Sequence, residues 1–222
     1  MKVKIPSRPV HIALFLLLAF LCYQVHQLTR HLVGAVLCAG FGTMTFTVTT
    51  TREPCVFPTL VILSGPLLTY GLAWLGMGLL RSPKYKLFAY ALIFASFAHL
   101  RFIQTLTGRG DELLLAKQWF GIRSQPLVAL LVFLISLPPI IAAFRAIANQ
   151  RRTLIFICSW VLPLPLLFAM LFGNQLLFGA NGTNSPGSSV LGILLIVFIT
   201  NLLASVMLIM FGPRYFRPQP EE

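Results

Sequence analysis

The chain has 222 residues, of which 57% are apolar and 10% are charged. A soluble domain carries roughly 25% charged residues, so a soluble enzyme, a disulfide scaffold and a disordered chain are all excluded. The formal net charge of +12 comes from basic residues at the ends of apolar runs, where they fix membrane orientation, and nucleic acid is therefore not an expected partner.

Six apolar runs follow one another along the chain, and each is close to the roughly 20 residues that a transmembrane helix needs. They cover residues 10–38, 58–80, 85–106, 126–148, 154–177 and 190–211. The connectors between them are too short to fold by themselves. The sequence therefore predicts an all-α polytopic membrane protein, with about six transmembrane helices in one domain over residues 1–222 and the lipid bilayer as a partner.

Basic residues gather on alternate connectors. They are frequent at the N-terminus and in the second and fourth connectors (Lys2, Lys4, Arg8, Arg81, Lys84, Lys86, Arg145, Arg151 and Arg152), whereas the first connector has Arg52 and the fifth has none. The third connector is mixed, because Arg109, Lys117 and Arg123 accompany Asp111 and Glu112. Connectors rich in Lys and Arg stay in the cytoplasm. We therefore predict a multi-pass protein of the bacterial inner (plasma) membrane with both termini in the cytoplasm.

The first connector carries two further signals. Residues 41–51 alternate threonine with apolar residues, a period of two that predicts one short β segment after the first helix. Cys38 and Cys55 bracket this segment on the predicted outer side, where disulfides form. Either a disulfide between them or two free buried thiols fits the sequence.

Polar residues interrupt the first apolar run at His26, Gln27, Arg30 and His31. Such residues in a membrane helix face the bundle interior or water. Residues four apart share a helix face, so His26 lies beside Arg30, and Gln27 beside His31. A zinc-binding helix has two His at this spacing with Glu after the first, and this run has neither feature.

The run from His26 to Ala35, followed by the glycine-rich segment 38–42, resembles the metal-binding helix and β segment of site-2-protease-type intramembrane metalloproteases. Ser64-Gly65-Pro66 is similar to the small-Gly-Pro turn of that family's next core helix. Asp111 lies roughly where the family places its third, carboxylate ligand. The resemblance implies a metalloprotease-like core over residues 10–120, with three further helices in 126–212.

The departures from the family pattern decide what the resemblance implies about activity. If His26 matches the first ligand, Gln27 replaces the catalytic Glu and Arg30 replaces the second His. If His31 matches the second ligand, Gln27 replaces the first His and Leu28 the Glu. Either way the base that takes a proton from zinc-bound water is missing. We therefore expect no catalytic residue, no zinc and no proteolysis.

Later polar residues leave alternatives open. In the third run, Arg101 either extends to the membrane interface or has a functional role. Asp111 and Glu112 either neutralise Arg109 and Lys117 at the head-group level or act as ligands. The candidate polar cluster is His26, Gln27, Arg30, His31, His99, Asp111 and Glu112.

Prolines predict helix breaks in the fourth run, at Pro138-Pro139, and in the fifth, at Pro163 and Pro165, because proline removes a backbone donor. Neighbouring helices or water must satisfy the freed carbonyls. Broken helices line substrate sites in transporters.

Three functions follow. The favoured one is a protease-like but non-catalytic scaffold that serves as a binding or assembly subunit of a membrane complex, with other membrane proteins as partners. The second is an active intramembrane metalloenzyme with unusual ligands, namely His26 or His31 with His99 and Asp111. The third is a small transporter or lipid-handling protein, which a polar path between the fourth and sixth helices would support.

The alternation of basic connectors gives a testable topology. Reporter fusions after Lys86 and after Arg152 should read cytoplasmic, and a fusion after Glu53 should read outside, because Lys and Arg resist translocation. An outside signal at Lys86 would contradict the six-helix topology.

Overall fold

The computed structural model describes residues 2–121, 124–178 and 189–216. These residues form α1 (Pro9–Leu37), α2 (Pro58–Leu79), α3 (Lys86–Ala95), α4 (Ala98–Leu106), α5 (Asp111–Phe120), α6 (Gln125–Ala146), α7 (Arg152–Val161), α8 (Pro163–Phe178), β1 (Ser189–Val190), β2 (Ile193–Leu194) and α9 (Leu195–Tyr215). Within the described ranges, six spans are long and apolar enough to cross a membrane, with α3–α4 and α7–α8 each counted as one broken span. The predicted all-α, multi-pass fold is confirmed.

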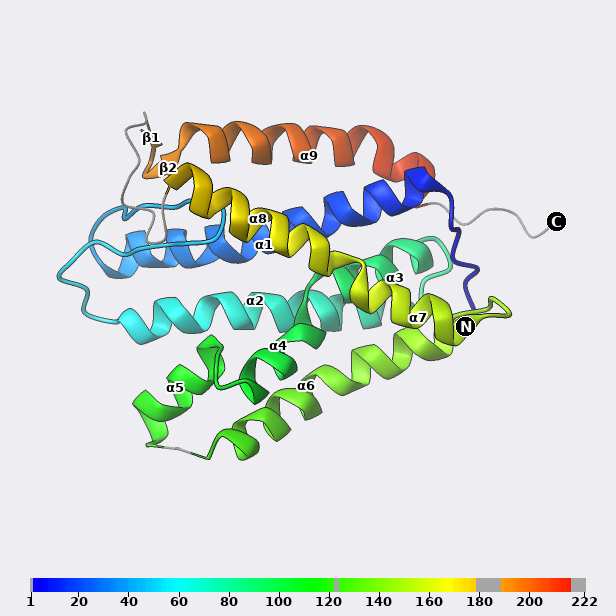
Figure 1. Ribbon diagram of the computed structural model, residues 1–222, viewed down its shortest axis with the longest axis horizontal. Helices are drawn as coiled ribbons and strands as arrows, with labels where there is room; N and C mark the ends of the chain where they lie inside the picture. The colour runs from blue at the N-terminus through cyan, green and yellow to red at the C-terminus, as the bar shows by residue number, and fades with distance from the viewer. Residues whose placement is uncertain (1, 122–123, 179–188, 217–222) are drawn as a thin grey trace.

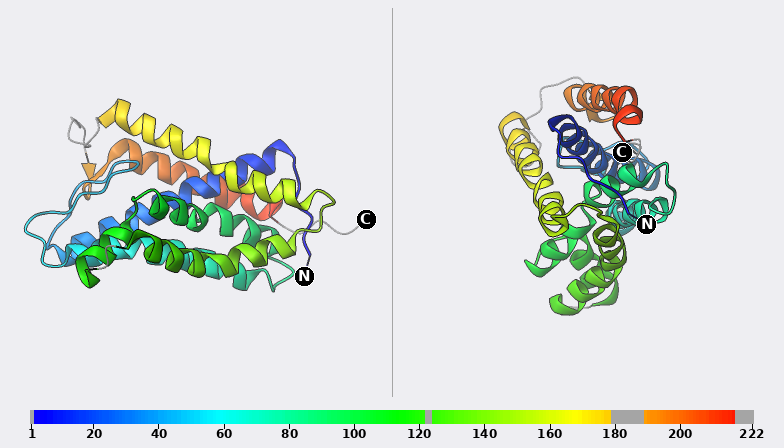
Figure 2. Two further views of the ribbon diagram at one scale, coloured as in Figure 1. Left: turned by 60° about the horizontal axis from the view of Figure 1, so that its bottom comes forward. Right: turned by 90° about the vertical axis from the view of Figure 1, so that its right-hand side faces the viewer.

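The spans lie side by side along the long axis of the molecule (Figure 1). α1 begins and α9 ends at one end, which we call the terminal end. The 38–57 connector, α5 and the short strands lie at the opposite end, the connector end, as Figure 2 also shows. The broken span α3–α4 is the most enclosed, with 78% of its apolar window buried, against 11% for α7–α8. Polar side chains on α4 therefore face other helices rather than lipid.

Short β pairing joins the connector after α1 to the segment before α9. Met44, which is fully buried, pairs with Thr49 within the connector and with Ile193 of β2. β1 and β2 form a two-residue antiparallel ladder next to it. The predicted β segment after the first helix is thus present, but the ladder occupies the residues before Leu195. The last span therefore begins at Leu195, five residues later than predicted.

The third span is broken at Phe97, whose φ of 61° lies in the left-handed region. No proline or glycine marks this position in the sequence. Ser136 of α6 donates a side-chain hydrogen bond to the carbonyl of Ala98 at 3.2 Å, directly after the break. This bond gives the buried Ser136 hydroxyl an acceptor and ties α6 to the start of α4. The break redirects α4 so that Arg101 reaches α1.

The fourth span differs from the prediction, because α6 runs without interruption through Pro138 and Pro139. Pro139 has no N–H to donate to the carbonyl of Ile135, four residues earlier. Trp74 of α2 donates its indole N–H to that carbonyl at 3.1 Å, so a neighbouring helix replaces the missing donor. The fifth span does break as predicted, with α8 beginning at Pro163.

A disulfide joins Cys38 to Cys55, whose Cα atoms are 4.3 Å apart. It closes a loop of about 18 residues and should contribute about 3 kcal/mol to the free energy of unfolding in the chain-entropy model. Mass spectrometry of protein digested without reductant should therefore find one peptide pair linked through these cysteines. Cys22 and Cys158 are free thiols and serve as controls that accept an alkylating reagent after denaturation. Alkylation of Cys38 and Cys55 without prior reduction would contradict the disulfide.

Candidate functional site

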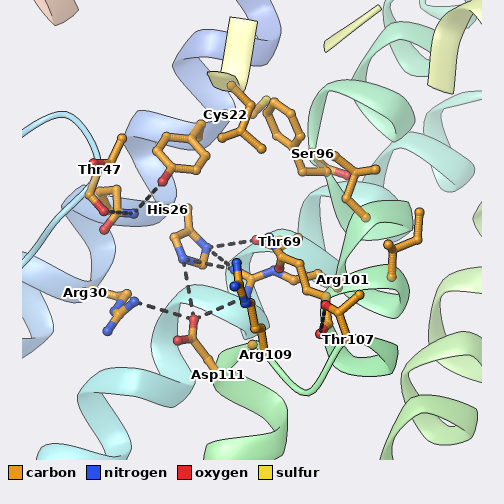
Figure 3. A pocket seen from close by; sticks show the side chains of 18 of the residues that line it. Cys22, His26, Arg30, Thr47, Thr69, Ser96, Arg101, Thr107, Arg109 and Asp111 are labelled. Carbon is orange, nitrogen blue, oxygen red and sulfur yellow. Dashed lines mark hydrogen bonds and ion pairs between the residues drawn. The ribbon is translucent and has the colours of Figure 1, made fainter. Parts of the chain in front are cut away.

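Polar side chains from four helices converge inside the bundle, and Figure 3 shows those of them that line a cavity. We call them the Arg101 cluster. Its members are His26 and Arg30 from α1, Thr69 and Tyr70 from α2, Arg101 from α4, and Asp111 and Glu112 from α5.

Arg101 lies at the centre of the cluster, with 11% of its side chain exposed. Its Nη2 lies 3.0 Å from Nε2 and 3.1 Å from Nδ1 of His26. Its Nη1 donates to Oδ2 of Asp111 at 3.2 Å and lies 3.6 Å from Oε2 of Glu112. A guanidinium can only donate, so this contact needs a lone pair on the His26 ring and fits a neutral imidazole. Arg101 therefore points into the bundle, where it contacts side chains from α1 and α5.

Asp111 is shared by cations from two helices. Besides Arg101, Nη1 of Arg30 donates to its Oδ2 at 3.5 Å, and Nε2 of His26 lies 4.0 Å from the same oxygen. His26 is also 3.0 Å from the Thr69 hydroxyl through Nδ1. One carboxylate thus ties α1 and α4 to the start of α5.

A tight turn between α4 and α5 delivers both acidic side chains to the cluster. Gly108 and Gly110 have φ values of 77° and 105°, which glycine adopts without steric cost. Asp111 and Glu112 then occupy the first turn of α5, at the positive end of the helix dipole. Oε1 of Glu112 accepts a hydrogen bond from the Tyr70 hydroxyl at 2.8 Å. The described contacts of the acidic pair are thus with Arg30, Arg101 and Tyr70, rather than with Arg109 and Lys117.

Gly65 lets α2 approach α1 at the cluster. A Cβ atom at this position would lie 2.5 Å from Cε1 and 2.7 Å from Nε2 of His26. Small residues permit such close packing between membrane helices. Gly65 lies inside α2 rather than at a turn, and its role here is to leave room for the imidazole.

A cavity of about 550 Å³ adjoins the cluster. Its polar wall includes His26, Arg30, Arg101 and Asp111, together with Arg109 from the α4–α5 turn. α8, in the fifth span, supplies apolar wall residues. The polar space thus lies between the first, third and fifth spans, and not between the fourth and sixth, where a transporter path was considered.

The other polar residues of α1 hold the connector end together. Gln27 donates to the Thr47 carbonyl at 3.3 Å and accepts from the Thr49 hydroxyl at 2.9 Å. His31 contacts the carbonyl of Leu191 through Nε2 at 2.8 Å. Both side chains therefore tie the segments that carry the β pairing to α1, and neither belongs to the Arg101 cluster.

His99 lies apart from the cluster. It is buried, and its ring centroid is 5.7 Å from that of Phe94 and 5.2 Å from that of Trp160. It does not line the cavity. The ligand set considered for an active metalloenzyme is thus divided among three places, with His26 beside Asp111 and both His31 and His99 elsewhere.

The residues of the cluster do not fit a zinc ion. A catalytic zinc site holds three protein ligands, each about 2 Å from the metal. Here a positively charged guanidinium is bonded to both His26 and Asp111, which would be two of the ligands. Among the residues that the structure describes, no three His, Cys, Asp or Glu side chains come together in a metal-holding group.

Thr69 and Tyr70 are cluster members that sequence reasoning missed. Both are uncharged and stand inside an apolar run, and membrane helices commonly carry such residues without a special role. Arg101 was recognised as polar, but the direction of its side chain depends on the break at Phe97, which has no sequence signal. A weak signal did exist for Gly65, through the Ser64-Gly65-Pro66 motif of the second span.

No protein-family model, no curated protein and no solved structure matches the chain. The fold is that of a multi-pass integral membrane protein. Its distinguishing feature is a buried cluster of paired charges beside a cavity.

The close approach at Gly65 gives a stability test. Gly65→Ala should lower the free energy of unfolding by about 1–3 kcal/mol, because the new methyl group overlaps the His26 ring and the packed helices cannot yield freely. Unfolding in mixed micelles, followed by circular dichroism, measures this change. Gly71→Ala is the matched control on the same helix, since nothing lies within 4 Å of its Cβ position. It should be neutral or stabilising by up to about 1 kcal/mol, and equal effects at both positions would contradict the packing.

Proposed function

We propose that the protein is a non-catalytic membrane protein with a metalloprotease-like scaffold, and that it acts by binding, as an assembly subunit of a membrane complex. The proposal joins the residue pattern around His26 to the contacts of Arg101. The observation that carries it is the guanidinium hydrogen-bonded to both His26 and Asp111. A metal bridging these two side chains would need the same space.

Gln27 supports the same proposal. It stands next to His26, where the metalloprotease pattern has its catalytic glutamate. Its amide donates to the Thr47 carbonyl and accepts from Thr49. A glutamate would have no donor for that carbonyl, so the amide suits a structural tie and not the removal of a proton from water.

Proposed partners are lipid and the helices of other membrane proteins. α9 buries 17% of its apolar window and α7–α8 bury 11%, so broad apolar faces remain for such contacts. We place the protein in the bacterial inner (plasma) membrane with both termini in the cytoplasm, on the basis of the basic connectors. The structure has α1 beginning and α9 ending at the same end (Figure 1), which is compatible with this orientation.

Metal analysis and a cleavage assay test the proposal. Purified protein should hold far less than one zinc per chain and should not cleave transmembrane peptides, because the base and the ligand set are lost. Gln27→Glu alone should change neither result. The triple variant Gln27→Glu, Arg30→His, Arg101→Ala restores His at the i and i+4 positions and removes the guanidinium, so it should gain zinc if the scaffold is protease-like.

Two outcomes would contradict the proposal. Stoichiometric zinc in the unaltered protein, with chelator-sensitive cleavage that His31→Ala abolishes, would establish an active metalloenzyme. A triple variant that folds, as judged by circular dichroism, and still binds no zinc would contradict the proposal that the scaffold is protease-like.

A further inference from the structure

Two arginines that line the cavity, Arg30 and Arg109, have donors that the described residues leave unused. Arg30 makes one hydrogen bond, the 3.5 Å contact to Asp111, and its Nε is buried without a described partner. Arg109 lines the same cavity, and no ion pair joins it to the described residues. Arg101, in contrast, is occupied by His26 and the two carboxylates. A guanidinium has five N–H groups in a planar fork that matches carboxylate and phosphate oxygens.

The charge of the cavity wall points to an anionic ligand. Arg30, Arg101 and Arg109 line it with Asp111 as the one acidic residue. Glu112 lies behind Arg101 against Tyr70 and offsets one further charge. The described wall therefore keeps an excess of positive charge. Arg30 and Arg101 are paired with the two carboxylates, whereas the exposed Arg109 has no ion pair with the described residues and is free to hold a bound anion.

Another part of the cavity wall is apolar. Leu167 and Phe168 of α8 line the cavity, as do Leu100 and Ile103 of α4. Phe168 is 66% exposed, so this wall continues onto the surface that faces lipid. Ligand pockets span roughly 300–1,000 Å³, and the cavity of about 550 Å³ has room for a head group and the first part of a chain. A ligand that fits both walls has an anionic end and a hydrocarbon end.

We propose that this cavity binds an anionic amphiphile, with its carboxylate or phosphate group on Arg30 and Arg109 and its hydrocarbon chain along Leu167 and Phe168. The inference rests on the proposed non-catalytic function, in which the cavity is available for binding rather than for catalysis. It adds the chemical class of the ligand. The anionic group could belong to a free fatty carboxylate or to a membrane phospholipid, which share the chemistry that the arginines recognise.

Native mass spectrometry of the full chain in detergent can test this, because the mass of the adduct identifies the ligand. Stearate, phosphatidylglycerol and phosphatidylcholine are titrated separately. One molecule of stearate or of phosphatidylglycerol should bind per chain, and the adduct mass distinguishes the two sources. Phosphatidylcholine, whose head group has no net charge, should bind about tenfold more weakly or not at all.

Arginine variants locate the site. Arg109→Gln and Arg30→Gln should each weaken binding of the anionic ligand about tenfold, because each removes a charged donor. Arg109 is exposed and Lys117 of α5 is exposed outside the cavity, so Lys117→Gln is the matched control and should bind like the unaltered protein. Circular dichroism and gel filtration verify that each variant folds.

Equal binding of phosphatidylcholine, or full anion binding by a folded Arg30→Gln, Arg109→Gln double variant, would overturn the ligand assignment. Neither result bears on the zinc and cleavage measurements. If the protein is free of zinc and inactive but binds no anion, the ligand assignment is therefore contradicted and the proposed function is not. Stoichiometric zinc would instead contradict the proposed function, on which the inference rests.

Discussion

The guanidinium of Arg101 is the constraint around which the enclosed part of the protein is arranged. A full positive charge inside a membrane bundle must have partners, because neither lipid nor the apolar core can solvate it. Two helices supply them, through His26 on α1 and Asp111 and Glu112 on α5. The break at Phe97 directs α4, which carries Arg101, towards them. Buried ion pairs of this kind add little net stability, but losing one partner is costly. The cluster therefore specifies one arrangement of α1, α4 and α5 more than it strengthens the fold.

Helical periodicity divides the polar residues of α1 between two tasks. His26 and Arg30 lie one turn apart and face the cluster, whereas Gln27 and His31, also one turn apart, bond to segments at the connector end. A single helix thus positions the charged interior and anchors the residues that cover it. A change in the register of α1 would disturb both tasks together, since the two faces are fixed by the same backbone.

Hydrophobic length alone predicted the existence and order of the spans, because the bilayer imposes a narrow range of helix lengths. The spacing of His26, Gln27, Arg30 and His31 predicted which pairs share a face. The sequence could not predict that Arg101 points inward, since the left-handed residue that turns α4 is a phenylalanine without a turn signature. α5 was missed because a helix of 10 residues in a connector carries no span-length signal. The prediction of a helix break at Pro138-Pro139 was wrong, because a side chain from another helix, Trp74, donates to the carbonyl of Ile135.

The indole of Trp74 gives α6 a dependence on its neighbour. Two successive prolines remove the helical donors of two carbonyls, here those of Leu134 and Ile135, and a carbonyl without a donor is strongly disfavoured in hydrocarbon. In this protein the donor for the Ile135 carbonyl comes from α2, which precedes α6 in the chain by two connectors. Membrane insertion in chain order therefore places the donor in the bilayer before the acceptor arrives. The hydrogen bond from Trp74 thus makes the continuous helix α6 dependent on contact with α2.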